Sequence, residues 1–272
     1  MRIKTSTIKY IVNNFFYLIP LVLIPTACMT FFFNPFKPLV FFQQLAKNGY
    51  RIDSWFGDVY RYFSIVNYNN VLLWLACVVL ALCSLSVVLS STERHMRLGV
   101  RNYRHLFRMF NDSVLYVLPV LLLFLIINEV FAVIVSGLIV LFSMFVSGVW
   151  LEVLAGVVWI LSSLLFIGLF VFSCCTVPSM ISDGYKFNVA LSYSISLVQN
   201  KFWQTFFSFV ATYLASLVIM CLVFYFLNPA FYVIKFLFLL VWLMFLPVFC
   251  MRKYVEFTGG DRKDIESSVF DR

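Results

Sequence analysis

Charged residues are scarce in this sequence of 272 residues. Asp, Glu, Lys and Arg together make up 12% of the chain, about half of their share in ordinary soluble domains. Hydrophobic residues make up 63%, and the mean hydropathy is +0.97. One water-soluble core cannot bury so much apolar surface, so we expect lipid to surround most of the chain. The scarcity of charge therefore excludes an ordinary soluble domain.

The sequence also lacks the residues that many catalytic and metal sites require. It has two histidines, His95 and His105, and no glycine-rich phosphate loop, nucleophile elbow or His-Glu metal motif. Its seven cysteines lie in or beside apolar stretches without the paired spacing of a metal site, which indicates small apolar fillers. We therefore predict a non-enzymatic protein with no cofactor and no metal.

Six apolar segments are long enough to cross a bilayer as helices, which takes about 20 residues each. They cover residues 14–33, 71–90, 113–137, 153–177, 203–227 and 230–250. The predicted fold is an all-α integral membrane bundle in one domain, residues 1–250, followed by a mixed-charge tail, residues 251–272. The apolar piece 138–152 predicts an interfacial or partly re-entrant turn. Pro20 and Pro25 predict kinks in the first span, whose freed carbonyls must be satisfied by neighbouring helices.

The distribution of basic residues predicts the orientation. Most of the 20 Lys and Arg residues fall at the start of the chain, between the second and third spans, between the fourth and fifth spans, and in the tail. Cytoplasmic loops are enriched in these residues, so we predict a bacterial inner-membrane protein with both termini in the cytoplasm. The net charge of +8 sits at the ends of apolar spans, which favours the membrane surface over nucleic acid as a partner.

The most basic of these segments is predicted to form an interfacial helix. Arg97, Arg101, Arg104 and Arg108 fall on one helical face, with aromatic and aliphatic residues opposite. Such a helix would sink its apolar face into the acyl boundary while its arginines meet lipid phosphates. The segment is either an anchor that only sets orientation, or a site that recognises anionic headgroups or an acidic membrane-protein partner.

A short pattern recurs three times along the chain. Apolar residues followed by Asn14, Asn111 and Asn200 each stand immediately before a predicted span. The similar spacing predicts three units, each with a cytoplasmic interfacial helix and a transmembrane hairpin. Helix capping by asparagine is an alternative explanation of the recurrence.

A family resemblance rests on the start of the third unit. The chain reads Pro178-Ser179-Met180-Ile181-Ser182-Asp183-Gly184, then Ala190-Leu191-Ser192-Tyr193-Ser194, then Asn200-Lys201-Phe202-Trp203. This pattern resembles the membrane domain of some bacterial glycerophosphodiester phosphodiesterases and of related stand-alone six-helix membrane proteins of unknown function. The resemblance implies a polytopic inner-membrane fold. It implies no hydrolase activity, because catalysis in that family belongs to a separate soluble barrel.

Two polar residues inside the third predicted span form a candidate site. Asn128 and Glu129 lie well within it, and an acid in lipid costs at least ~2.5 kcal/mol unless it is paired or protonated. Lys235 is the basic residue inside the last span, and its depth differs from that of Glu129 by only ~5 Å at ~1.5 Å per residue. We predict a Glu129–Lys235 pair, with Glu152 as a competing partner for the lysine.

The fifth span carries a stripe of small residues, Ser208, Ala211, Thr212, Ala215 and Ser216. Such a stripe permits close helix approach, and we expect it to pack inside the bundle instead of forming a dimer contact.

Two classes of function fit these features. The first, which the sequence favours, is a membrane scaffold or accessory subunit that contacts anionic lipid and partner membrane proteins. The alternative is a small transporter or lipid-handling protein with a polar site around Asn128 and Glu129. A cavity that reaches this site favours the alternative, and a lipid-tight core favours the scaffold.

Overall fold

A computed structural model describes residues 7–32, 37–47, 56–68, 70–98, 106–226 and 231–258. Every regular element within these ranges is an α-helix, which confirms the predicted all-α class. The helices are α1 (Thr7–Asn13), α2 (Phe15–Phe32), α3 (Lys37–Lys47), α4 (Phe56–Phe63), α5 (Val71–Leu98), α6 (Leu106–Ser143), α7 (Val149–Ser173), α8 (Thr176–Asp183), α9 (Phe187–Gln199), α10 (Phe202–Phe226) and α11 (Phe231–Thr258).

Five helices are long and apolar enough to cross a membrane: α5, α6, α7 with α8, α10 and α11. A sixth span results if α1 and α2 count as one, although they meet at an angle of 91° around Asn14. In the most apolar windows of α6 and α7 only 11% of residues are buried, so their remaining apolar side chains face outward. These features are those of a multi-pass membrane protein, in which lipid covers the outward apolar surface.

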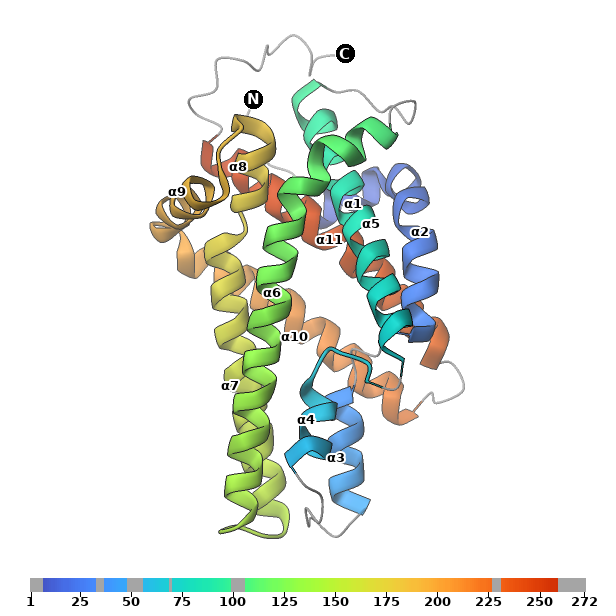
Figure 1. Cartoon of the computed structure of the whole chain (residues 1–272), viewed down its shortest axis with the longest axis vertical. Coiled ribbons are helices and arrows are strands. Elements are labelled where there is room, and N and C mark those ends of the chain that lie inside the picture. The colour runs from blue at the N-terminus through green and yellow to red at the C-terminus, as the bar shows by residue number, and fades with distance from the viewer. Residues whose placement is uncertain are drawn as a thin grey trace.

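The prediction for residues 138–152 is wrong. Helix α6 continues to Ser143, a short turn follows, and α7 begins at Val149. Gly148 adopts a φ of +73° in this turn, a conformation that favours glycine. With 38 residues, α6 is ~57 Å long at ~1.5 Å per residue, well beyond the ~30 Å hydrocarbon core. Figure 1 shows α6 and α7 extending past the other long helices toward α3 and α4.

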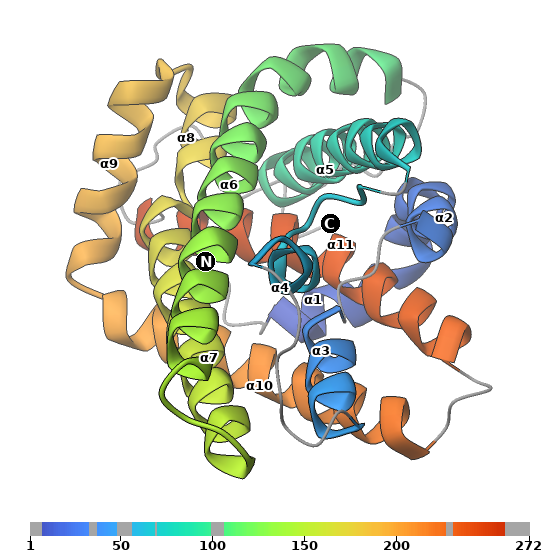
Figure 2. The same cartoon turned by 60° about the horizontal axis from the view of Figure 1, so that its bottom comes forward.

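The long helices form two groups that meet along α5, α6 and α11. Helices α2, α5 and α11 pack against one another, while α6 packs on α5 and α7, and α7 on α10. In the view of Figure 2, α11 crosses between α5 and α10. Helix α11 packs most on α2 and α5, and α10 packs most on α7. The last two spans therefore contact other helices more than they contact each other.

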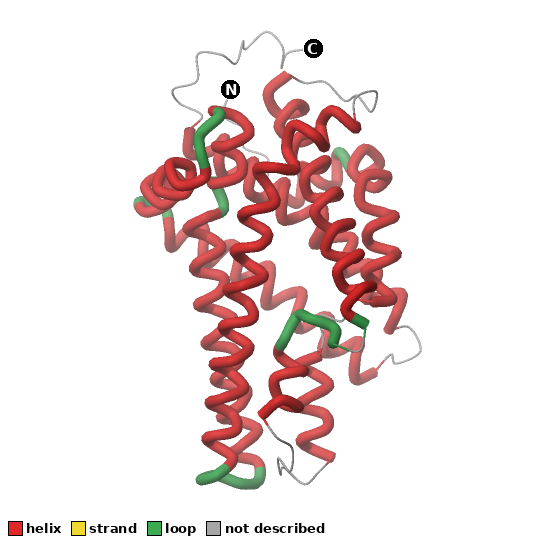
Figure 3. Tube along the Cα trace, in the orientation of Figure 1, coloured by secondary structure: helices red, strands yellow, loops and turns green. Residues whose placement is uncertain are grey.

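Helices α3 and α4 cover the far end of the α6–α7 pair. Their buried side chains Phe41, Leu45 and Val59 form a small separate core with Ile139 of α6 and Leu151 of α7. Figure 3 shows the non-helical stretch that follows α4 and leads back to α5. We call this region the α3–α4 end, and the opposite region, with α1, α8 and α9, the α1 end.

Proline and hydroxyl residues explain the close packing of α2 on α5. Pro25 cannot donate to the carbonyl of Leu21, and the Ser84 hydroxyl of α5 donates to that carbonyl at 3.2 Å. This contact confirms that a neighbouring helix satisfies a carbonyl freed by a proline in the first span. A similar contact joins α6 to α5, where the Ser113 hydroxyl lies 3.0 Å from the carbonyl of Ser86.

Several residues of the segment 178–203, which carries the family resemblance, have clear structural roles. Between α7 and α8 the helix breaks, and Ser194 of α9 bridges the break by donating to the Phe172 carbonyl at 2.7 Å and accepting from the Cys175 amide at 3.1 Å. Gly184 ends α8 with a φ of +71°. Ala190 is fully buried, so α9 can lie close against α7.

The predicted arginine helix is divided between two elements. Arg97 belongs to the last turn of α5 and Arg108 to the first turn of α6, whereas Arg101 and Arg104 lie outside the described residues. Asp112 lies 3.8 Å from both Arg94 and Arg108, so it joins the ends of the two helices. The prediction of one separate interfacial helix through Arg97 and Arg108 is therefore wrong.

Two further expectations from the sequence are also wrong. The Asn14 side chain does not cap α2, because its Oδ1 accepts no hydrogen bond while its amide donates back to the Tyr10 carbonyl at 2.8 Å, and Asn111 lies inside α6. In the small-residue stripe of α10, Ser208, Ala211 and Ala215 are exposed on the outside of the bundle, so the stripe is not an internal packing seam.

Candidate functional site: a two-part cavity beside Glu129

The carboxylate of Glu129 accepts three hydrogen bonds from the end of α4. The Tyr60 hydroxyl lies 2.6 Å and the Ser64 hydroxyl 2.8 Å from Oε2, and the backbone N–H of Ile65 lies 3.0 Å from Oε1. Bonds from three donors stabilise a carboxylate inside a membrane helix. Glu129 therefore holds the α4 end of the molecule onto α6.

Lys37 at the start of α3 binds the same loop. Its ammonium donates to the carbonyl of Ser64 at 3.1 Å and to the carbonyl of Val66 at 2.7 Å. These two bonds use two of its three N–H donors. Glu129 accepts hydrogen bonds from the stretch Ser64–Val66 and Lys37 donates hydrogen bonds to it. Both residues therefore hold this stretch in place.

Burial shifts the pKa values of two groups around this loop. It lowers the pKa of the Lys37 ammonium from its ordinary value, and the nearby Glu129 carboxylate opposes that shift. Burial raises the pKa of the Tyr60 hydroxyl, and its hydrogen bond to Glu129 raises it further. Tyr60 therefore remains a protonated donor in alkaline solution.

The predicted pair between Glu129 and Lys235 does not form. Lys235 is buried on α11 with its Nζ 6.0 Å from the ring centre of Tyr232, while Glu129 receives its bonds from α4 and the loop after it. Helix α6 packs on α4, α5, α7 and α8, whereas α11 packs on α1, α2, α5, α8 and α10. Similar depth therefore did not bring the two charges together. Glu152, the competing partner, lies in the first turn of α7.

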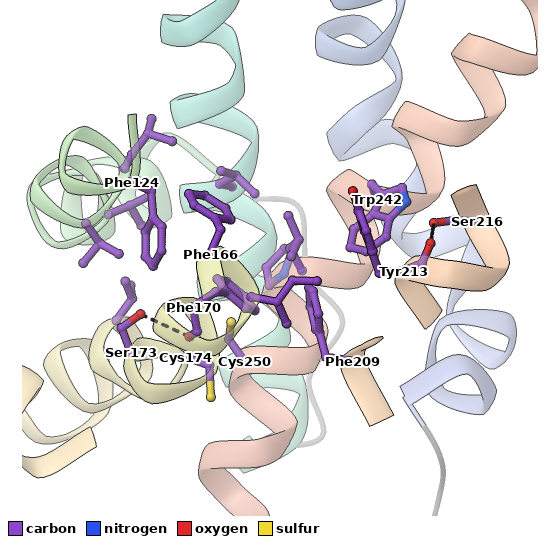
Figure 4. Close-up of a pocket in the computed structure, with 18 of the residues that line it drawn as sticks. Phe124, Phe166, Phe170, Ser173, Cys174, Phe209, Tyr213, Ser216, Trp242 and Cys250 are labelled. Atoms are coloured by element: carbon purple, nitrogen blue, oxygen red, sulfur yellow. Dashed lines mark hydrogen bonds between the residues drawn. The ribbon is translucent and has the colours of Figure 1, made fainter. Parts of the chain in front are cut away.

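An apolar chamber of about 460 Å³ lies between α5, α6, α7, α10 and α11. Figure 4 shows Phe124, Phe166 and Phe170 on one side of it and Phe209, Tyr213 and Trp242 on the other. Its few polar lining atoms include the hydroxyl of Ser173, which already donates to helix carbonyls. The chamber can therefore hold a hydrocarbon group and little else.

A second chamber of about 280 Å³ adjoins the first toward the α3–α4 end. The two chambers share five lining residues, Pro38, Trp159, Phe166, Ile167 and Tyr213. The second chamber is more polar than the first, because Lys37, Ser64, Asn128, Ser162 and Ser163 line it beside apolar residues. We call the two spaces the apolar chamber and the polar chamber.

Asn128 is the member of the predicted polar site that lies at this cavity. It lines the polar chamber, and its amide nitrogen is buried without a hydrogen-bond partner in the structure. Glu129, the next residue, points instead toward the loop after α4. The structure therefore separates the two neighbours: Glu129 bonds to the loop after α4, and Asn128 lines the polar chamber with its amide nitrogen buried.

Sequence reasoning missed Lys37, Tyr60 and Ser64. They lie in a polar connection between the first two spans, which we interpreted only as a loop. A signal was present, because Glu129 needed a compensating group and Lys37 stands immediately after the first apolar segment. No three His, Cys, Asp or Glu side chains lie close enough to hold a metal ion in the described ranges.

Protein-family models, curated proteins and solved structures were all compared with this chain, and none matches it. The resemblance to the membrane domain of glycerophosphodiester phosphodiesterases therefore stays a prediction from the residues 178–203.

Proposed function

We propose that this protein is a lipid-handling membrane protein that takes one amphipathic lipid molecule into its two-part cavity. The observation that carries the proposal is an apolar chamber that shares five lining residues with a more polar one inside a bundle of apolar helices. This is the second of the two classes that the sequence left open. The proposed role is binding or transfer, without covalent chemistry.

The size of the apolar chamber supports an occupant. Apolar walls around an empty space lack the dispersion contacts that an occupant would supply, so filling the chamber with a hydrocarbon group is favourable. Both chambers together fall within the range of small-molecule sites, roughly 300–1,000 Å³. An acyl chain of a bilayer lipid is the apolar group that is available to fill the chamber in a membrane.

The distribution of Lys and Arg supports an orientation. In a bacterial inner membrane with both chain termini in the cytoplasm, the α1 end with Arg94 and Arg108 faces the cytoplasm. The polar chamber then lies toward the outer side. Reporter fusions at the two ends of the chain test this arrangement.

The three-unit plan is also part of the proposal. The 91° bend between α1 and α2, and the helix α9 before α10, support an interfacial helix ahead of two of the hairpins. The first turns of α6 take that place in the middle unit. Within this plan Arg97, Arg101, Arg104 and Arg108 meet anionic headgroups, and the exposed Arg108 side chain is the described member available to do so.

The test is to identify lipid bound to the purified protein and to block the chamber. Native mass spectrometry after transfer into detergent is expected to find a lipid retained by the wild-type chain. Val120→Trp places a large ring in the apolar chamber and should abolish retention. Leu115→Trp is the matched control, because Leu115 is 71% exposed on the outer face of the same helix. Equal retention by both variants would contradict the proposal.

A scaffold role is a second candidate, favoured by the tip of the α6–α7 pair. Met144, Phe145 and Trp150 are more than 70% exposed there, at the end that extends past the other long helices. Exposed aromatic clusters of this kind mark contact surfaces. A membrane-protein partner that co-purifies with the wild type and is lost from Phe145→Ser and Trp150→Ser would support this role.

A further inference from the structure

The charge of the polar chamber has one sign. Lys37 is the single fully charged residue among the described residues that line the two chambers. Its bonds to the Ser64 and Val66 carbonyls fix the ammonium in place and leave a third N–H donor for another acceptor. A preplaced cation in a partly buried space favours an anion, because charge interactions strengthen as the effective dielectric constant falls.

Glu129 lies close enough to interact with Lys37, and its carboxylate is held by hydrogen bonds of its own. Its carboxylate accepts bonds from Tyr60, Ser64 and the Ile65 amide, and it lines a separate outward groove beside Trp74. It is not among the residues that line the polar chamber. Its negative charge is therefore satisfied by hydrogen bonds from α4 and from the loop after it.

Asn128 supplies the second donor. A buried amide N–H without a partner costs roughly 1–3 kcal/mol relative to a satisfied one, so such groups are rare in folded proteins. The Asn128 nitrogen is one of them, and the hydroxyls of Ser162 and Ser163 line the same chamber from α7. An oxygen acceptor placed in the chamber would satisfy the amide once the amide group turns its nitrogen, which is buried as it stands, toward the chamber.

Lys37 and Asn128 come from different helices that line the chamber, α3 and α6. Trp159, Phe166 and Tyr213 line both chambers, so the two spaces are adjacent. A hydrocarbon chain attached to an oxyanion in the polar chamber would then be placed beside the apolar chamber.

We infer that the polar chamber binds the oxyanion headgroup, a carboxylate or a phosphate monoester, of a single-chain lipid whose hydrocarbon chain occupies the apolar chamber. The inference rests on the proposed function and specifies its ligand. One chamber of 460 Å³ accommodates one chain, which separates this ligand from two-chain phospholipids. The oxyanion accepts from the Lys37 ammonium and the Asn128 amide together.

The test uses three probes with the same saturated chain: a fatty acid, a lysophosphatidic acid and a neutral monoacylglycerol. Binding to the full chain in nanodiscs of zwitterionic lipid is measured by native mass spectrometry and by competition. We expect at least one anionic probe to bind about tenfold or more tightly than the neutral one, and the stronger of the two identifies the headgroup. Equal affinity for all three overturns the inference and leaves the proposed function standing. Failure of all three to bind overturns the proposed function itself.

Variants of the two donors complete the test. Asn128→Leu keeps the branched shape of the side chain and removes the amide, so it should lower anionic affinity about tenfold and leave neutral affinity unchanged. Lys37→Gln should remove the preference for anions, and Lys37→Arg should keep it. Because Lys37 also holds the loop after α4, the melting temperature of each variant is measured alongside. Full anionic affinity in a folded Asn128→Leu protein would overturn the role of the amide.

Discussion

Helix α11 and the span formed by α7 and α8 are equally apolar and take opposite positions in the molecule. In their most apolar stretches, half of the residues are buried within the protein in α11, against 11% in the α7–α8 span. Met244, Phe249 and Tyr254 of α11 are almost completely buried, whereas Leu161 and Leu165 of α7 are more than half exposed. The comparison teaches that hydropathy reports the need for an apolar environment without saying whether protein or lipid provides it.

The helices around α2 and α5 also differ from those around α6, α7 and α10 in the side chains that lie between them. Around α2 and α5, small hydroxyl residues donate to carbonyls of the neighbouring helix, as Ser84 does to Leu21, and the helices lie close together. Around α6, α7 and α10, rings such as Phe124, Phe170 and Phe209 face one another and hold the helices apart. Small residues therefore allow close packing of α2 on α5, and aromatic residues line the chamber beside α6, α7 and α10.

The largest effect on stability is expected at Glu129, which joins the α3–α4 end to α6. Glu129→Leu removes the acceptor of three hydrogen bonds and leaves Tyr60, Ser64 and the Ile65 amide without it. We expect a loss of about 3 kcal/mol in the free energy of unfolding, measured by thermal or denaturant unfolding in detergent. Glu152→Leu is the control and should cost far less.

Reversing the charges of Glu129 and Lys235 tests whether these two residues form an ion pair. Because the two residues have different neighbours, the double variant Glu129→Lys with Lys235→Glu should be no more stable than Glu129→Lys alone. Restoration of stability by the second change would contradict the observed contacts of Glu129.

Matched enlargements compare the two groups of helices directly. Ser86 is fully buried where α5 meets α6, and Ser86→Leu should cost about 1–3 kcal/mol through overpacking. Val120→Trp adds volume to the chamber, so it should change the melting temperature less while removing the bound lipid. If Val120→Trp proves the more destabilising, the chamber is not open to added volume.

The pH dependence of anion binding gives a smaller effect, about tenfold. Burial lowers the pKa of Lys37 below its ordinary value of 10.5, so the ammonium is lost as the pH rises toward that value and anionic affinity should fall. The other titratable groups around it are Glu129 on α6, Tyr60 and Tyr62 on α4, and Tyr213 on α10. Because the pKa of Tyr60 is raised, its bond to Glu129 persists over this range.

The measurement follows binding of a fatty-acid probe from about pH 8 to about pH 11, where its carboxylate stays ionised. Lys37→Gln should show low affinity with little pH dependence, and Lys37→Arg should keep its affinity at high pH. A wild-type affinity that rises with pH would contradict the role of Lys37.

The smallest effect is expected on the outward face of α10. Ser208 is exposed, so Ser208→Leu should change the free energy of unfolding by less than about 0.5 kcal/mol. Unfolding measured in detergent at two protein concentrations checks this value. A large, concentration-dependent loss would show that the stripe contacts a second copy of the chain.

Much of the fold was predictable because the signals are local. The apolar segments predicted the long helices, and Pro25 predicted a carbonyl that a neighbour must satisfy. Asn128 and Glu129 were identified as polar residues that need compensation. The partner of Glu129 was not predictable from depth alone, since depth along a helix carries no information about which helices are neighbours. Tyr60 and Ser64 reach Glu129 only because α3 and α4 fold against α6.

The sequence by itself determined that the chain is a helical membrane protein, because hydropathy and helix length are properties of each segment alone. Only the tertiary structure decided that α11 is central and α7 peripheral, that Asn128 lines a cavity while Glu129 binds the loop after α4, and that Lys37 lines the same cavity. The physical reason is that lipid and apolar side chains are equally good neighbours for an apolar helix. The lateral arrangement is therefore set by close packing, ring contacts and a few hydrogen bonds, which depend on residues distant in the chain.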